Sequence, residues 1–324
     1  MSSALISALR ILVLFALALP GALLAQNYPT KPIHLVVGFT PGGGVDINAR
    51  LLASKLSEYL GQQVIVENRP GAGTNIANEF VAKAAPDGYT LLMSTATVAI
   101  NMALYKKVNF DTLRDFAAVS LFSASPNVLV VNAAVPVTSV AQLVALARAR
   151  PGALNYSSAG SGTTQHLSGE LFKTRTGTDI VHVAYKGTAP ALTALIAANV
   201  ELSFANIPAI HQHVKSGRLR PLASTGPKRS VLMPGVPTMK EAGVDMEVVV
   251  WYGVLAPAAT PPEIVNKLAG LIARAAHSAD VRQRLLDQGA EPVGNTPEEF
   301  SRQLRDEVAT WAEVVKSSGA KADE

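Results

Sequence analysis

The feature that most constrains the fold is a regular alternation of short apolar runs with segments of helical period. Residues 33–39 form an apolar run typical of a buried strand, residues 45–60 carry apolar side chains at helical spacing, and residues 64–67 form the next apolar run. The alternation continues to about residue 224. Strands that alternate with helices predict right-handed crossovers and mainly parallel sheets flanked by helices. We therefore expect an α/β fold.

The last third of the chain departs from this alternation. After a segment rich in proline and glycine at 226–243, a single expected strand at 246–255 is followed only by helical patterns, which cover residues 261–276, 281–288 and 296–316. Helices with so few strands of their own must pack on a sheet that was begun earlier in the chain. The sequence therefore predicts that the chain leaves a first sheet, builds a second one and returns.

This path predicts two lobes joined by two crossings of the chain. We expect residues 26–125 and 226–324 to form the first lobe, and residues 126–225 to form the second. Two crossings make a hinge, and they leave a cleft between the lobes in which a ligand can bind. Each lobe is long enough to bury a core of its own.

The first 25 residues have the layout of a cleaved secretory signal peptide. A start whose single charge is Arg10 precedes an aliphatic run at 11–19, a Pro-Gly break and small residues that end at Ala25. The aliphatic run is shorter than the roughly 20 residues that span a bilayer. We expect cleavage near Ala25 and an exported mature protein.

Composition excludes several classes of site. The chain contains no cysteine, which excludes disulfides, thiolate metal sites and cysteine nucleophiles. Its formal charge is only +4, and no run of lysine and arginine is interleaved with aromatic residues. A mild charge of this kind aids solubility and gives no reason to expect a nucleic-acid partner.

Three glycine-rich loops each lie between an expected strand and an expected helix. None completes the dinucleotide fingerprint, and no G-K-S or G-K-T follows, so neither a dinucleotide site nor a P-loop is expected. Glycines let a ligand approach the backbone, and the first N–H groups of a helix can hold an anion. A tight turn after a strand is the alternative for each loop. The loops contain Gly42-Gly43-Gly44, Gly71-Ala72-Gly73 and Gly160-Ser161-Gly162.

Small polar side chains follow the same strand ends. Ligands of open α/β sheets bind beyond the carboxyl ends of the strands, where all three loops must lie. Ser94, Thr95, Ser157 and Asn206 offer directional hydrogen bonds there without the cost of burying a charge. Asp46 lies in the first turn of an expected helix, four residues before an arginine, so a structural pairing is favoured over ligand contact at that position.

Catalysis and metal binding find little support. The six histidines form no H-E-x-x-H motif, and His211 and His213 point to different faces of an expected helix. Ser161 lies outside a G-x-S-x-G elbow because Ala159 occupies the first glycine position. His166 has no acidic partner that can be named, so a structural role is favoured over general base catalysis. We expect no enzyme activity, no metal and no cofactor.

Seven motifs follow one another from about Tyr28 to the end of the chain. They read G-F-T-P-G-G-G-V-D-I-N-A-R, E-N-R-P-G-A-G-T-N-I-A, A-A-P-D-G-Y-T-L-L, Y-S-S-A-G-S-G-T-T-Q-H-L, Y-K-G-T-A-P-A-L-T-A-L, V-P-T-M-K-E-A-G and W-Y-G-V-L-A-P. In this order and spacing they resemble the Bug family, which comprises the periplasmic substrate-binding receptors of tripartite tricarboxylate transporters.

The resemblance implies a two-lobed Venus-flytrap fold, like that of type II periplasmic binding proteins. Such a receptor closes on a small organic acid, such as a di- or tricarboxylate, and hands it to a membrane permease. It implies a periplasmic location and loops 39–46 and 157–163 that grip a carboxylate. Together with the strand-end residues, the expected ligand-binding residues are Phe39, Thr40, Gly42, Gly43, Gly44, Asp46, Asn75, Ser94, Thr95, Ser157, Gly160, Ser161, Thr163, Tyr185 and Asn206.

Three positions depart from the family pattern. Thr40 stands where a second proline is common, Asn75 where a glycine is common, and Ala205 where many relatives carry an aspartate. The missing aspartate removes a partner for a cationic group of the ligand, which favours a plain carboxylic acid over an amino acid.

Two alternatives to a transport receptor stay open at this point. One is a sensor that presents its closed form to a membrane partner, and the other is a carboxylate-processing enzyme with His166 as its base. Because a receptor must close freely, we expect a monomer.

Overall fold

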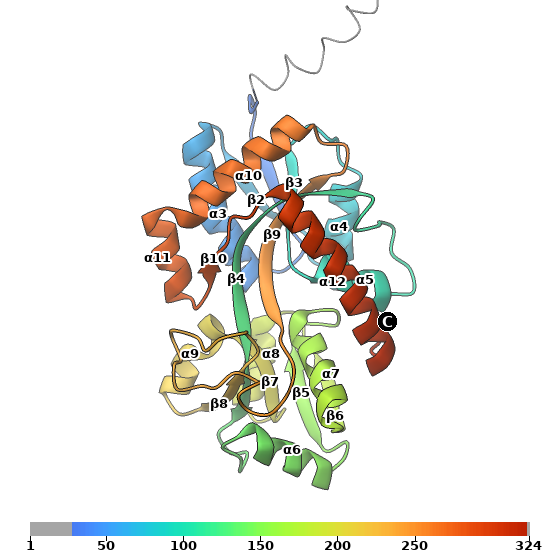
Figure 1. Ribbon diagram of the computed structural model, residues 1–324, viewed down its shortest axis with the longest axis vertical. Coiled ribbons are helices and arrows are strands. Elements are labelled where there is room, and N and C mark those ends of the chain that lie inside the picture. The colour runs from blue at the N-terminus through green and yellow to red at the C-terminus, as the bar shows by residue number, and fades with distance from the viewer. Residues whose placement is uncertain (1–27, 323–324) are drawn as a thin grey trace, which may run out of the picture.

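The computed structural model describes residues 28–322, and the expected signal peptide at 1–25 lies outside this range. The molecule is elongated, with strands and helices gathered in an upper and a lower half (Figure 1). Among the described residues, no helix is both long and apolar enough to cross a bilayer.

The first strand group lies in the upper half and consists of three parallel strands. β1 (Ile33–Val37) pairs with β2 (Val64–Asn68) on one side and with β3 (Thr90–Ser94) on the other. β1 reads I-H-L-V-V and is almost wholly buried, as expected for a strand covered on both faces. The linking helices are α3 (Gly44–Leu60), α4 (Asn75–Ala82), which follows the short 3₁₀ turn η1 (Ala72–Thr74), and α5 (Thr97–Leu104).

The second strand group lies in the lower half and repeats this arrangement. β5 (Leu154–Ser158) pairs in parallel with β6 (Ile180–Ala184) and with β7 (Leu202–Asn206). The helices around these strands are α6 (Val140–Ala149), α7 (Thr164–Thr176), α8 (Thr188–Ile196) and α9 (Ile207–Lys215).

Two long strands connect the strand groups. β4 (Phe116–Asn132) pairs with β9 (Val249–Pro257) up to Pro126, and from Asn127 onward it pairs with β7 and with β8 (Leu219–Ser224). β9 also pairs with β3, so that the strand order is β2-β1-β3-β9-β4-β7-β5-β6 (Figure 1). β4 is therefore one continuous strand that belongs to both halves.

The α/β class is confirmed, but the sheets are mixed rather than mainly parallel. β4 pairs antiparallel with β7, β8, β9 and the short β10 (Glu291–Pro292), and β3 also pairs antiparallel with β9. The cause is the path of the chain: β4 runs from one half into the other, and β9 returns beside it in the opposite direction. The apolar run at 127–131, which reads as a strand in the sequence, is only the last part of β4.

The C-terminal helices pack on a sheet begun earlier, as predicted. α10 (Pro262–His277) packs against β4 and α3, and it is followed by α11 (Ala279–Asp287). α12 (Pro297–Ser318) begins with a capping box between Thr296 and Glu299. Because α12 packs against α5 and also against α7, it contacts helices of both halves (Figure 1).

A carboxylate fastens α12 to the connecting strand β9. Glu307 on α12 accepts a hydrogen bond from the indole of Trp251 on β9 at 2.9 Å, and a second one from the indole of Trp311. Burial raises the pKa of the Glu307 carboxyl, although the indole donors partly offset this effect. The two indoles thus have a shared acceptor that water does not easily replace.

Replacing Glu307 by alanine tests this attachment. Two indole N–H groups lose their acceptor, so we expect the free energy of unfolding to fall by about 2 kcal/mol in chemical denaturation. Glu313→Ala is the matched control, since Glu313 is exposed on the same helix. Equal stabilities of the two variants would contradict the proposed role of this contact.

Candidate functional site

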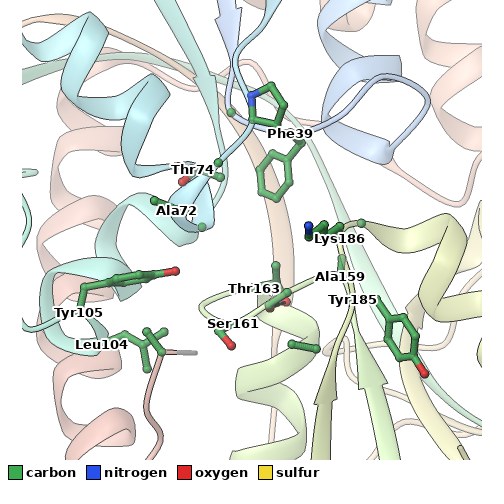
Figure 2. Close-up of a pocket in the computed structure, with 18 of the residues that line it drawn as sticks. Phe39, Ala72, Thr74, Leu104, Tyr105, Ala159, Ser161, Thr163, Tyr185 and Lys186 are labelled. Carbon is green, nitrogen blue, oxygen red and sulfur yellow. Dashed lines mark hydrogen bonds between the residues drawn. The ribbon is translucent and has the colours of Figure 1, made fainter. Parts of the chain in front are cut away.

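A cavity of about 1210 Å³ lies between the two strand groups. One wall comes from the loops after β1 and β2 and from the end of α5, and includes Phe39, Ala72 and Tyr105. The other wall comes from the loops after β5 and β6, and includes Ser161 and Lys186. Figure 2 shows these side chains facing one another across the open space.

The three predicted glycine loops all lie at carboxyl ends of strands and reach this cavity or its inner end. The first follows β1, the second follows β2 and the third follows β5. Gly162 in the third loop has a left-handed φ of 81°, and a Cβ there would lie 2.5 Å from Oδ1 of Asn101 on α5. Glycine is therefore required for the two halves to approach this closely.

A smaller recess of about 60 Å³ continues from the cavity toward the strand ends. It is lined by hydroxyl side chains from both halves, among them Thr40, Thr95 and Thr163. Helix α3 begins here after Gly43 and α8 begins here after Gly187, and neither start has a side-chain cap. The first-turn N–H groups of these helices are thus available to an anion.

Tyr252 on β9 closes one side of this recess. A Cβ at Gly44 would lie 2.6 Å from the Tyr252 hydroxyl, so the first turn of α3 rests directly on that group. Burial raises the pKa of Tyr252 to about 12, although a hydrogen bond with Ser125 opposes the shift. The hydroxyl therefore keeps its proton at neutral pH and can donate to an anion.

Charge around the cavity has one sign. Among the described residues that line the cavity and the recess, none is an aspartate or a glutamate. Four exposed lysines stand along the cavity, namely Lys106, Lys107, Lys186 and Lys321. The described residues also contain no group of three potential metal ligands. The arrangement suits an anionic solute and offers a cationic group no acidic partner.

Ten of the fifteen expected ligand-binding residues line the cavity or the recess. Tyr185 does so through its backbone, since its ring points away from the cavity (Figure 2) and packs against the core of the second strand group. The ten are Phe39, Thr40, Gly43, Gly44, Thr95, Gly160, Ser161, Thr163, Tyr185 and Asn206.

The other five expected residues lie off the lining, and each has a structural environment that explains this. Gly42 turns the loop with a φ of 82° and donates its N–H to Asp46. Asn75 accepts a hydrogen bond from Asn101 at 2.7 Å. Ser94 and Ser157 are buried within their strands.

Asp46 is the fifth, and it holds the first loop together. Burial opposes ionisation of its carboxyl, but hydrogen bonds from Arg50, Gly42 and Asn68 outweigh burial and lower its pKa. The carboxylate thus stabilises the start of α3 through its hydrogen bonds to Arg50, Gly42 and Asn68. This is the structural pairing that the sequence favoured.

His166 does not line the cavity, which argues against its role as a general base. The residue is 2% exposed, and its Nδ1 accepts a hydrogen bond from the backbone N–H of Gly162 at 3.2 Å. A ring that is enclosed in this way has no direct path to a bound solute.

Several lining residues were not among the expected ligand-binding residues. Lys186 and Thr188 lie beside Gly187, between β6 and α8, so this strand–glycine–helix pattern could have identified them as lining residues. Tyr105 and Lys107 follow a helix without any distinctive pattern. Lys321 reaches the cavity only because α12 extends from one half to the other.

Comparison with known proteins agrees with this geometry. The family model described as "Tripartite tricarboxylate transporter family receptor" matches residues 48–320. The chain belongs to this family. The Bug-family resemblance and the periplasmic-binding-protein fold that it implied are therefore confirmed.

The relatives are similar along nearly their whole length. Protein BugT of Bordetella pertussis is 40% identical over 300 residues, which are 92% of each chain. The structure of Rpa4515 from R. palustris with adipate has a TM-score of 0.86 and 42% identity, over 91% of this chain and 99% of that one. MatC from Rhodopseudomonas palustris with bound malate has a TM-score of 0.83 and 31% identity, over 89% of this chain and all of that one.

Gly162→Ala tests the close approach of the halves at the cavity. The added methyl group meets Asn101, so the loop must shift, and we expect affinity for an organic acid to fall about tenfold for 1.4 kcal/mol of strain. Gly217→Ala is the control, because Gly217 has a similar φ of 72° with nothing within 4 Å of its Cβ position. Calorimetric titration that gives equal affinities for the two variants would contradict this reading.

Proposed function

We propose that this protein is an exported, monomeric periplasmic receptor that binds a small organic acid between two lobes and delivers it to a membrane permease. We take residues 26–125 and 249–324 as one lobe and residues 126–248 as the other, because Met233 and Val236 pack in the core cluster of the second strand group. The observation that carries the proposal is the recess where uncapped helix starts and hydroxyl groups from both strand groups converge. Such a site neutralises a carboxylate without any cationic side chain.

The two halves meet at this recess. Thr40 in the loop after β1 has its hydroxyl oxygen 3.2 Å from the position that a Cβ of Gly187 would occupy, in the loop after β6. A carboxylate held there contacts both loops at once. Because its contacts with the second loop exist only when the halves are together, binding favours the closed arrangement.

The walls of the cavity indicate the rest of the ligand. Phe39, Pro70, Leu104 and Tyr105 supply apolar or aromatic surface to the wall of the cavity, along which the four exposed lysines also stand. We propose an acid whose carboxylate lies in the recess, whose apolar chain lies along this surface, and whose second anionic group faces the lysines. The relative Rpa4515, which was determined with adipate, supports this class.

A plain acid fits better than an amino acid. The cavity and recess contain no carboxylate among their described lining residues, so an ammonium group of the ligand has no ionic partner. Asn206 follows Ala205, the position where many relatives carry an aspartate. Its side chain is already hydrogen-bonded within the protein, since Nδ2 donates to Oδ1 of Asn127 at 3.0 Å.

The proposal is tested by titration calorimetry of the mature protein with adipate, malate, benzoate and glutamate. We expect adipate to bind most tightly and glutamate least. Thr40→Val preserves shape but removes a hydroxyl donor, so adipate affinity should fall about tenfold. Thr310→Val, on the exposed face of α12, serves as control. Absence of binding by every acid in the panel would overturn the proposal.

A further inference from the structure

Two stacked imidazoles lie directly behind the third glycine loop. The ring of His166 on α7 lies over the ring of His182 on β6, with centroids 3.9 Å apart and planes inclined by 18°. Tyr156 on β5 also contacts His182, at 4.9 Å between centroids. Neither histidine lines the cavity, so the site described above leaves this pair without a role.

Each imidazole is hydrogen-bonded to a different part of the loop. Nδ1 of His166 accepts the backbone N–H of Gly162 at 3.2 Å. Nε2 of His182 lies 2.6 Å from the hydroxyl oxygen of Ser158, which in turn accepts the N–H of Gly160 at 3.1 Å. The amides at both ends of the segment that contains Ser161 thus depend on the two rings.

The neighbouring groups do not replace these contacts. On α7, Glu170 forms an ion pair with Lys173 and also accepts the hydroxyl of Tyr156 from β5. The Glu170 carboxylate therefore already has a cationic partner and a hydroxyl donor. From α5 the neutral amide of Asn101 lies close to Gly162.

Helix α12 also packs against α7. It contributes the apolar side chains of Trp311 and Val315 to the core cluster that contains Leu167. The contribution of these two residues to the surroundings of α7 is therefore apolar.

We propose that the His166–His182 pair is a proton-sensitive positioning element for the third glycine loop. An imidazole can accept the Gly162 N–H only while Nδ1 carries no proton. Two protonated rings in a stack at this distance also repel each other. Protonation therefore releases Gly162 and separates the rings, and the loop loses the arrangement that presents Ser161 and Thr163 to the cavity.

The proposal rests on the proposed carboxylate binding at this cavity and adds a pH dependence to it. If the loop must hold unprotonated histidine to grip the ligand, affinity is full at a pH where both rings are neutral, and it declines as the pH falls and the rings take up protons. One linked proton gives at most a tenfold loss per pH unit, so we expect about a tenfold loss of affinity between pH 8 and pH 5.5.

The first test is titration with adipate at pH 8, 7, 6 and 5.5. His166→Asn keeps an acceptor oxygen near the Nδ1 position but does not titrate, so it should bind within about threefold of the wild type at pH 8 and lose most of the pH slope. His182→Gln should act in the same direction. His211→Asn, on α9 away from the cavity, should keep the wild-type slope. Because all variants are compared at the same pH, ionisation of adipate cancels.

The second test needs no ligand. In the ¹H–¹⁵N spectrum of the free protein, the Gly160 and Gly162 amides should shift together as the histidines titrate, and the Gly162 shift should disappear in His166→Asn. Failure of adipate to bind at pH 8 would count against the proposed function. The amide titration would still test the role of the histidine pair, because it needs no ligand. A wild-type slope retained in His166→Asn, or Gly162 amide shifts that do not respond to pH, would overturn it.

Discussion

The antiparallel pairing of β4 with β9 is the constraint on which the rest of the structure depends. Both strands lie between the two strand groups: β9 pairs with β3 of the first group, and β4 pairs with β7 of the second. This pairing sets the distance between the carboxyl ends of β1 and β5, and thereby the distance between the loops that follow them. The Glu307 carboxylate adds a second link, because it joins α12 to β9 beside the same connection.

The site itself is built from main-chain groups more than from charged side chains. Helix starts at Gly44 and Thr188 present their amides toward one recess, and threonine hydroxyls complete it. A carboxylate can exchange water for such fixed dipoles without requiring an oppositely charged partner, whose burial would be costly. The lysines are confined to exposed positions along the cavity, where they attract anions but can adjust to solutes of different length.

The features of the fold that depend on hydrophobic period and on turn residues were predictable from the sequence. The three glycine loops, the α/β class and the packing of the C-terminal helices on an earlier sheet all follow from period and turn residues. The first half of β4 did not, because residues 116–126 mix serine, alanine and proline with few long apolar side chains. Tyr252 and Lys321 were missed for another reason: they reach the site through the return of the chain in its last third, which no local pattern specifies.

The most direct test of the account is a crystal structure of the mature protein with adipate. We predict one carboxylate in the recess, with its oxygens within hydrogen-bonding distance of the first-turn amides of α3 and of the Thr40 and Thr163 hydroxyls, and the other end toward Lys186. A structure in which both carboxylates contact only the exposed lysines, with the recess occupied by water, would contradict the claim that helix amides and hydroxyl groups at the recess hold the ligand.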